Sequence, residues 1–131
     1  MKVTIFYGPE RTGKTMVART IIQLAGKEKT VWIRGRFLYG KNAQIPPRFF
    51  DECDENTELI VIDDCHTDMK LDFLRESVKN GFLCVDRKYG EPIYLYNVSV
   101  ILTTNVDFQN WEECFDYVKF PIHILKEEVV V

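Results

Sequence analysis

The eight residues from Gly8 to Thr15, GPERTGKT, constrain the fold of this chain more than any other stretch. A short β-branched and aromatic run at 3–7 precedes them, and a segment with apolar residues at helical spacing follows from Gly13 to Ala25. The order of strand, glycine-rich loop and helix is the context that the phosphate-binding pattern G-x-x-x-x-G-K-[ST] requires. The segment therefore predicts a nucleotide-binding loop at the start of an α/β fold.

Each residue type in this loop has a physical task in holding a nucleoside triphosphate. Glycines let backbone N–H groups curl around the phosphates, and the N-terminus of the following helix adds a partial positive charge. Lys14 is expected to reach the β- and γ-phosphates and to act in catalysis, and Thr15 is expected to ligate Mg²⁺. The predicted cofactors are ATP and Mg²⁺, and the predicted binding residues are Gly8, Pro9, Glu10, Arg11, Thr12, Gly13, Lys14 and Thr15.

The rest of the chain continues the alternation of strands and helices. Short apolar or β-branched runs predict strands at 30–33, 59–62, 82–85, 93–96, 98–102 and 118–125. A helix is expected around Leu71, Leu74 and Val78, between an N-cap at Asp68 and a left-handed Gly81, and a short one at 111–115. The acidic stretch 51–58 is interpreted as a solvated linker. We expect one domain over residues 1–131, a mostly parallel sheet flanked by helices.

Two acids and an asparagine follow the strands that are expected to lie inside this sheet. Asp63 and Asp64 come directly after the uninterrupted apolar run LIVI, which is typical of a parallel strand buried on both faces. Such a strand delivers Asp63 to hold Mg²⁺ through water and Asp64 to orient or deprotonate an attacking water. Asn105 closes the run Thr103-Thr104-Asn105 after the next apolar strand, where a polar side chain can orient water at the γ-phosphate. Asp64 and Asn105 are therefore predicted to be catalytic.

Composition and charge exclude several other classes of protein. The formal net charge is −3, so no global charge draws the chain to nucleic acid or to an anionic membrane. No apolar run reaches the roughly 18 residues of a membrane helix, and Met1 leads straight into a strand-like run instead of a secretory leader. The four cysteines lack the close spacing of zinc or redox motifs. We expect a cytoplasmic protein with reduced thiols, no membrane contact and no structural metal.

Local charge allows contact with single-stranded DNA. Segment 27–48 is basic and segment 51–72 is acidic, so the chain is electrically polarised. Arg87 and Lys88 stand at the expected tip of a hairpin, beside Tyr89, whose ring is able to stack on a base. These two basic residues are the predicted nucleic-acid contacts, although a solvated hairpin tip has the same composition.

The order of these parts resembles the superfamily 3 helicase domain of replication initiator (Rep) proteins from small DNA viruses and related plasmids, especially circovirus-like Reps. The likeness rests on GPERTGKT, LIVIDD, the basic hairpin and ILTTN, and it covers nearly the whole chain. It implies a RecA/AAA+-like sheet, ATP hydrolysis, a homo-oligomer that is usually a hexamer, and a nuclear location if the host is eukaryotic. It matches Gly8–Thr15 to Walker A, Asp63 and Asp64 to Walker B, Asn105 to motif C, and Lys88 to a lysine that faces single-stranded DNA in the central channel.

The sequence also departs from this family. Such Reps usually carry an endonuclease domain and a helical region before the ATPase, so the chain is either an excised domain or a free-standing relative. The family supplies an arginine finger after motif C, whereas Arg87 is the last arginine here and Lys119 is the candidate substitute. Two other functions stay open: a small-molecule kinase with a phosphate loop, and a nucleotide-gated binding module with little hydrolysis.

Overall fold

A five-stranded parallel sheet forms the centre of the computed structural model. The structure describes residues 1–10, 12–26, 29–35, 50, 52–65, 72–85, 90–105 and 115–119. The strands of this sheet are β1 (Lys2–Tyr7), β2 (Thr30–Arg34), β3 (Leu59–Cys65), β6 (Ser99–Thr104) and β7 (Asp116–Lys119). Their order is β2-β3-β6-β1-β7, and every neighbouring pair is parallel. The predicted α/β class is confirmed, and all five carboxyl ends lie at one edge of the sheet.

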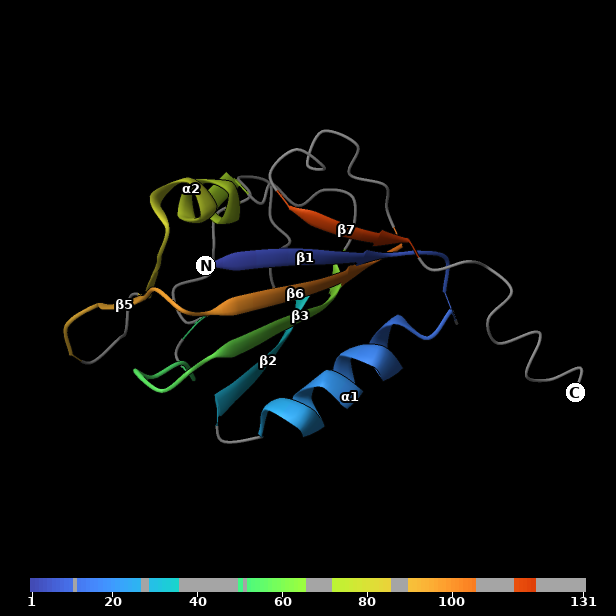
Figure 1. Ribbon diagram of the computed structural model, residues 1–131, viewed down its shortest axis with the longest axis horizontal. Helices are drawn as coiled ribbons and strands as arrows, with labels where there is room; N and C mark the ends of the chain where they lie inside the picture. The colour runs from blue at the N-terminus through green and yellow to red at the C-terminus, as the bar shows by residue number, and fades with distance from the viewer. Residues whose placement is uncertain are drawn as a thin grey trace, which may run out of the picture.

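The two described helices cover opposite faces of this sheet (Figure 1). Ala18 of α1 (Lys14–Ala25) is buried with Phe6 and Val61 on one face. Leu74 of α2 (Asp72–Asn80) is buried with Ile5 and other strand residues on the opposite face. Successive strand side chains alternate between the two clusters, which is why LIVI is apolar without interruption. Neither helix is long and apolar enough to cross a bilayer, as far as the described ranges extend.

A separate two-stranded hairpin lies near the amino ends of the large sheet. Its strands are β4 (Leu83–Val85) and β5 (Ile93–Leu95), which pair antiparallel and confirm the predicted hairpin. Gly81 ends α2 in the left-handed conformation at φ +83°, and its N–H donates to the Ser77 carbonyl at 2.8 Å. The glycine is needed there for its conformation. The tip at 86–89, which includes Arg87 and Lys88, lies outside the described residues.

Several predicted boundaries differ from the structure. The prediction of a solvated linker at 51–58 is wrong for Cys53 and Thr57, which are only 2% and 6% exposed. Polar residues extend β3 to Cys65 and β6 to Thr104, because the side chains of these residues bond across the strands. The last strand starts at Asp116 instead of 118. The predicted cap at Asp68, residues 111–114 of the short helix predicted at 111–115, and the strand beyond 119 lie outside the described residues.

Candidate functional site

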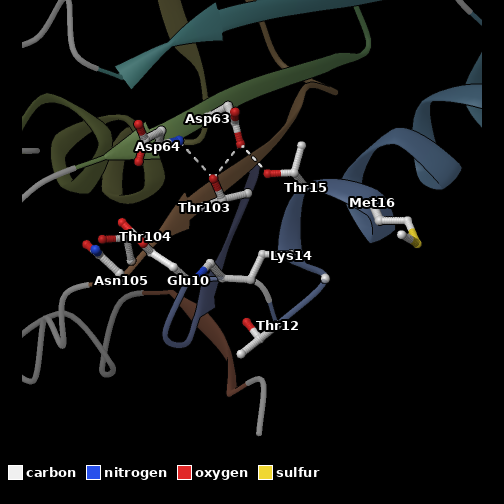
Figure 2. Close-up of a pocket in the computed structure, with 11 residues that line it drawn as sticks. Glu10, Thr12, Lys14, Thr15, Met16, Asp63, Asp64, Thr103, Thr104 and Asn105 are labelled. Carbon is white, nitrogen blue, oxygen red and sulfur yellow. Dashed lines mark hydrogen bonds between the residues drawn. The ribbon is translucent and has the colours of Figure 1, made fainter. Parts of the chain in front are cut away.

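One pocket lies where the carboxyl ends of β1, β3 and β6 meet (Figure 2). Ligands of open parallel sheets bind at this edge because the strands deliver their loops and helix N-termini to it. The pocket encloses about 450 Å³, a volume in the range of small-molecule sites. Its lining brings together three segments far apart in the sequence, namely Glu10, Thr12, Gly13, Lys14, Thr15 and Met16, then Asp63 and Asp64, then Thr103, Thr104 and Asn105.

The glycine-rich loop is closed by bonds within itself. The Thr12 hydroxyl, almost wholly buried, donates to the Pro9 carbonyl at 2.8 Å. Gly13 has φ +91° with no atom within 4 Å of the place where a Cβ would stand, so it is needed for its backbone angle. Helix α1 then begins without a side-chain cap and without an acidic residue in its first turn. Its N-terminal N–H groups and their partial positive charge therefore suit an anion.

Lys14 folds back over the loop that carries it. Its ammonium donates to the carbonyls of Gly8 and Pro9, the latter at 2.8 Å. Burial lowers the pKa of Lys14, while the negative charges of Asp64, Glu10 and Asp63 act in the opposite direction. A polyanion placed in the loop would raise this pKa, because it adds negative charge beside the ammonium. The Lys14 ammonium is thus held at the loop by two backbone carbonyls.

Asp63 and Asp64 lie on an irregularity of β3. Ile62 pairs with Leu102 and Cys65 pairs with Thr104, so two residues of β3 face only Thr103 on β6. This arrangement is a β-bulge, which commonly re-aims side chains near functional sites. Asp64 has φ +61°, the one positive φ of a non-glycine residue in the described part of the chain. The bulge leaves the Asp64 side chain exposed and Asp63 half-buried.

Short hydrogen bonds join the bulge to the loop and to β6. The Thr15 hydroxyl donates to Asp63 Oδ1 at 3.1 Å, and the Thr103 hydroxyl donates to the same oxygen at 2.7 Å. The Asp64 backbone N–H donates to Thr103 Oγ1 at 2.8 Å (Figure 2). The sequence analysis assigned a role only to Asn105 in the run Thr103-Thr104-Asn105. The role of Thr103 depends on the bulge in β3, which the residue pattern does not predict.

The donor set fits Mg²⁺ bound together with a nucleotide. Thr15 and Asp63 present a hydroxyl and a carboxylate oxygen 3.1 Å apart. Mg²⁺ prefers oxygen ligands, and it is usually held by one or two protein groups with phosphate oxygens and water completing the octahedron. Within the described ranges no three of His, Cys, Asp and Glu group closely enough to hold a metal without such help. The predicted pair of metal-binding residues is therefore together in space.

The other predicted site residues fall into three groups. Asp64 and Asn105 line the same pocket with exposed side chains, as Figure 2 shows. Arg11, Arg87 and Lys88 lie outside the described residues. Lys119, the proposed substitute for an arginine finger, pairs with Tyr7 in the register of β7 and β1. Lys119 therefore lies at the carboxyl end of β7, beside Tyr7, the residue that precedes the first glycine of the loop.

Comparison with known proteins gives distant relatives that match most of this chain. Replication protein E1 of human papillomavirus 37 is 28% identical over 123 residues, which are 91% of this chain and 18% of that protein. An insertion sequence IS232 protein from Bacillus thuringiensis subsp. berliner, designated ATP-binding, is 32% identical over 92% of this chain and 47% of its own length. The chain thus spans under half the length of these relatives. No protein-family model matches it.

Solved structures show the same fold. The C-terminal region of NrS-1, in its apo form, superposes with a TM-score of 0.63 at 18% identity, covering 96% of this chain and 30% of that chain. A second structure of that region, residues 305–718, gives a TM-score of 0.60 at 17% identity. With the papillomavirus relatives, the resemblance to viral replication proteins that the motifs predicted is confirmed.

Proposed function

We propose that this chain is an ATP-binding and ATP-hydrolysing domain of the replication helicase type. The single observation that carries the proposal is the meeting of the glycine-rich loop with the β3 acids, joined by the bond from Thr15 to Asp63. A phosphate-binding loop alone binds nucleotide, whereas acids beside it supply a place for Mg²⁺ and for water. The relatives named replication protein and ATP-binding protein support the same assignment.

The pocket suggests a division of labour for hydrolysis. The loop from Gly8 to Thr15 holds the phosphates, with Lys14 facing the β- and γ-phosphates. Thr15 and Asp63 hold Mg²⁺, which neutralises phosphate charge when it is bound. Asp64 and Asn105, both exposed toward the pocket, orient the attacking water, and Asp64 accepts its proton. Inorganic phosphate released without any acceptor would distinguish hydrolysis from a kinase reaction.

Loss of the lysine charge tests nucleotide binding. The removal of one charge-assisted contact costs about 1.5–3 kcal/mol, so Lys14→Ala should weaken ATP binding tenfold or more. Calorimetry with ATP and Mg²⁺ measures this affinity. Lys79→Ala, which removes an exposed lysine from the last turn of α2, is the matched control and should bind ATP as the wild type does. Equal affinities for all three proteins would refute the assignment of the loop.

We also propose that the domain acts on single-stranded DNA as a homo-oligomer. The support is the hairpin of β4 and β5, which the sequence predicted together with a basic tip at Arg87 and Lys88. Each neutralised phosphate contributes about −0.7 to the slope of log affinity against log salt. Lys88→Ala should therefore flatten that slope by about this amount in a titration of labelled single strands.

If Lys88→Ala keeps the affinity and the salt dependence of the wild type, the tip of the hairpin is a solvated turn that does not contact DNA. Glu91→Gln, three residues after Lys88 in the sequence, is the control, because it changes charge without removing a cation. Sedimentation velocity with ATP and single-stranded DNA tests the oligomer, which should appear as a species several times the 15.4 kDa of the chain.

A further inference from the structure

We propose that Thr103 is a positioning residue that fixes both acids of the site through one hydroxyl group. This inference rests on the proposed function. It says that Thr103 holds Asp63 and Asp64 in position beside the glycine-rich loop. Its basis is the double use of one oxygen. Thr103 Oγ1 donates to Asp63 Oδ1 at 2.7 Å and accepts the Asp64 N–H at 2.8 Å.

The bulge creates the need for this hydroxyl. With two residues of β3 opposite one of β6, the ladder of backbone bonds is interrupted at Asp63 and Asp64. The Thr103 side chain accepts the Asp64 N–H in place of a backbone carbonyl. Asp64 has the left-handed φ of +61°, a conformation that costs free energy and persists only where the surroundings enforce it. Thr103 is the described side chain that bonds to the backbone N–H of Asp64.

Few residue types could replace Thr103. The position requires a group that donates and accepts from one atom at nearly the same place, which a hydroxyl does and a methyl does not. Thr103 is 2% exposed, so water has little access to make the same bonds. Without the hydroxyl, the Asp64 N–H and one lone pair of Asp63 would both lose a partner.

Asp63 depends on this bond for its orientation. Thr15 and Thr103 both donate to Asp63 Oδ1, but Thr15 is also the hydroxyl assigned to Mg²⁺. When Thr15 serves the metal, Thr103 is the described donor left to hold the carboxylate. Partners that orient metal-binding side chains in this way typically change metal affinity or activity by about 10–100-fold when they are removed.

The neighbouring threonine has a different task. Thr104 Oγ1 donates to the Cys65 carbonyl at 2.8 Å, so this hydroxyl joins β6 to the backbone of β3. The chain also contains a second buried threonine that bonds an aspartate. Thr57 Oγ1 accepts from the Asp54 N–H at 2.9 Å and lies 3.5 Å from Asp54 Oδ1, at the other edge of the sheet. Thr57 thus provides a matched control for the same substitution.

The test compares Thr103→Val, Thr103→Ser and Thr57→Val with the wild type. The affinity of a non-hydrolysable ATP analogue is measured by calorimetry over a series of Mg²⁺ concentrations. In Thr103→Val, the Mg²⁺ concentration that gives half of the full increase in analogue affinity should rise by about tenfold or more. The affinity for the analogue without Mg²⁺ should change by less than about twofold. Thr103→Ser restores the hydroxyl and should stay within about threefold of the wild type. Thr57→Val should leave the Mg²⁺ requirement unchanged.

An unchanged Mg²⁺ requirement in Thr103→Val would overturn the proposal, and so would a Thr103→Ser variant as impaired as Thr103→Val. Failure of the wild type to bind the analogue would refute the proposed function instead.

Hydrogen exchange of the Asp64 amide tests the role of Thr103 without any nucleotide. The amide should be protected in the wild type and in Thr103→Ser, and it should exchange at least about tenfold faster in Thr103→Val. If Thr103→Val does not fold, Thr103→Ala replaces it, and an unprotected Asp64 amide in the wild type overturns the proposal by itself.

Discussion

The two edges of the large sheet both carry a pocket with acids, yet the chemistry of these pockets differs. The pocket at the amino edge is larger, about 720 Å³ against about 450 Å³ at the carboxyl edge. It is lined by the segment Asp54–Glu58, by Tyr94–Asn97 and by Lys29. Pocket volume alone would therefore point to the amino edge as the functional site. The hydrogen bonds and backbone angles point to the carboxyl edge instead.

The same pair of residue types shows the difference. At the amino edge Asp54 and Thr57 are three residues apart, and their bonds close a turn, as side chains of this kind commonly do. Lys29 pairs with Glu58 at 3.4 Å there, and both side chains are well exposed. At the carboxyl edge Asp63 and Thr103 are 40 residues apart, and their bond joins two strands at a bulge. A local pair stabilises its own turn, whereas a long-range pair positions one element against another.

The sharpest way to break this comparison is to remove one carboxylate from each edge. Asp64→Asn should leave ATP affinity within about twofold and lower turnover by about 10²–10⁴, the usual contribution of a general base. The amide cannot accept a proton from water, and the substitution keeps the size of this exposed side chain. Asp54→Asn makes the same change at the amino edge and should keep the turnover of the wild type. Phosphate release under saturating ATP measures both variants.

Comparable turnover in Asp64→Asn and the wild type would mean that the acids of the carboxyl edge do not take part in hydrolysis. A similar loss in Asp54→Asn would show that the two edges are coupled, and the comparison would then fail.

Two glycines sharpen the comparison through stability. A Cβ on Gly35 would lie 2.7 Å from Cys65 Sγ and 2.9 Å from the Asp63 carbonyl oxygen, so the end of β3 would have to move. Overpacking of this kind costs about 1–3 kcal/mol, and Gly35→Ala should in addition weaken Mg²⁺-dependent ATP binding because it displaces the bulge. Gly81→Ala meets no atom within 4 Å and is strained only by its φ of +83°. It should lower the free energy of unfolding by about 1–2 kcal/mol, the cost of an L-residue in the left-handed conformation, and leave ATP binding unchanged.

Urea denaturation measures the stability of both glycine variants, and calorimetry measures the ATP affinity. Loss of ATP affinity in Gly81→Ala at a similar cost in stability would show that the site responds to general weakening of the fold and not to the position of β3.

The sequence predicted most of the elements but not the geometry that connects them. Apolar runs such as LIVI are local signals, and the parallel sheet, both described helices and the hairpin follow from them. The loop, Asp63, Asp64 and Asn105 were predicted from their places after strands, and Asp63, Asp64 and Asn105 line one pocket together with Glu10 and residues 12–15 of the loop. The bulge and the role of Thr103 depend on register between β3 and β6, to which no local pattern points. The linker prediction was wrong for Cys53 and Thr57 because the acids around them make the whole segment look solvated.

The smallest expected effect concerns Cys53, the buried thiol next to the amino-edge turn. Burial raises the pKa of Cys53 to about 12 from 9.0, and the charges of Asp54 and Glu52 act in the same direction. The folded chain therefore keeps this proton at a pH where the unfolded chain has begun to lose it. It follows that the free energy of unfolding falls as pH rises from the unfolded pKa toward the folded one.

Between pH 8.5 and 9.5 one such thiol accounts for a loss of about 0.7 kcal/mol, since only the unfolded state titrates in this window. Cys53→Ala should be less stable at every pH because it leaves a small cavity, but its stability should fall less steeply in this window. The difference in slope, measured by urea denaturation at several pH values, isolates the thiol from the cavity, whose cost does not depend on pH. Equal slopes would mean that the Cys53 thiol ionises alike in both states, and that the amino-edge turn does not shield it from water.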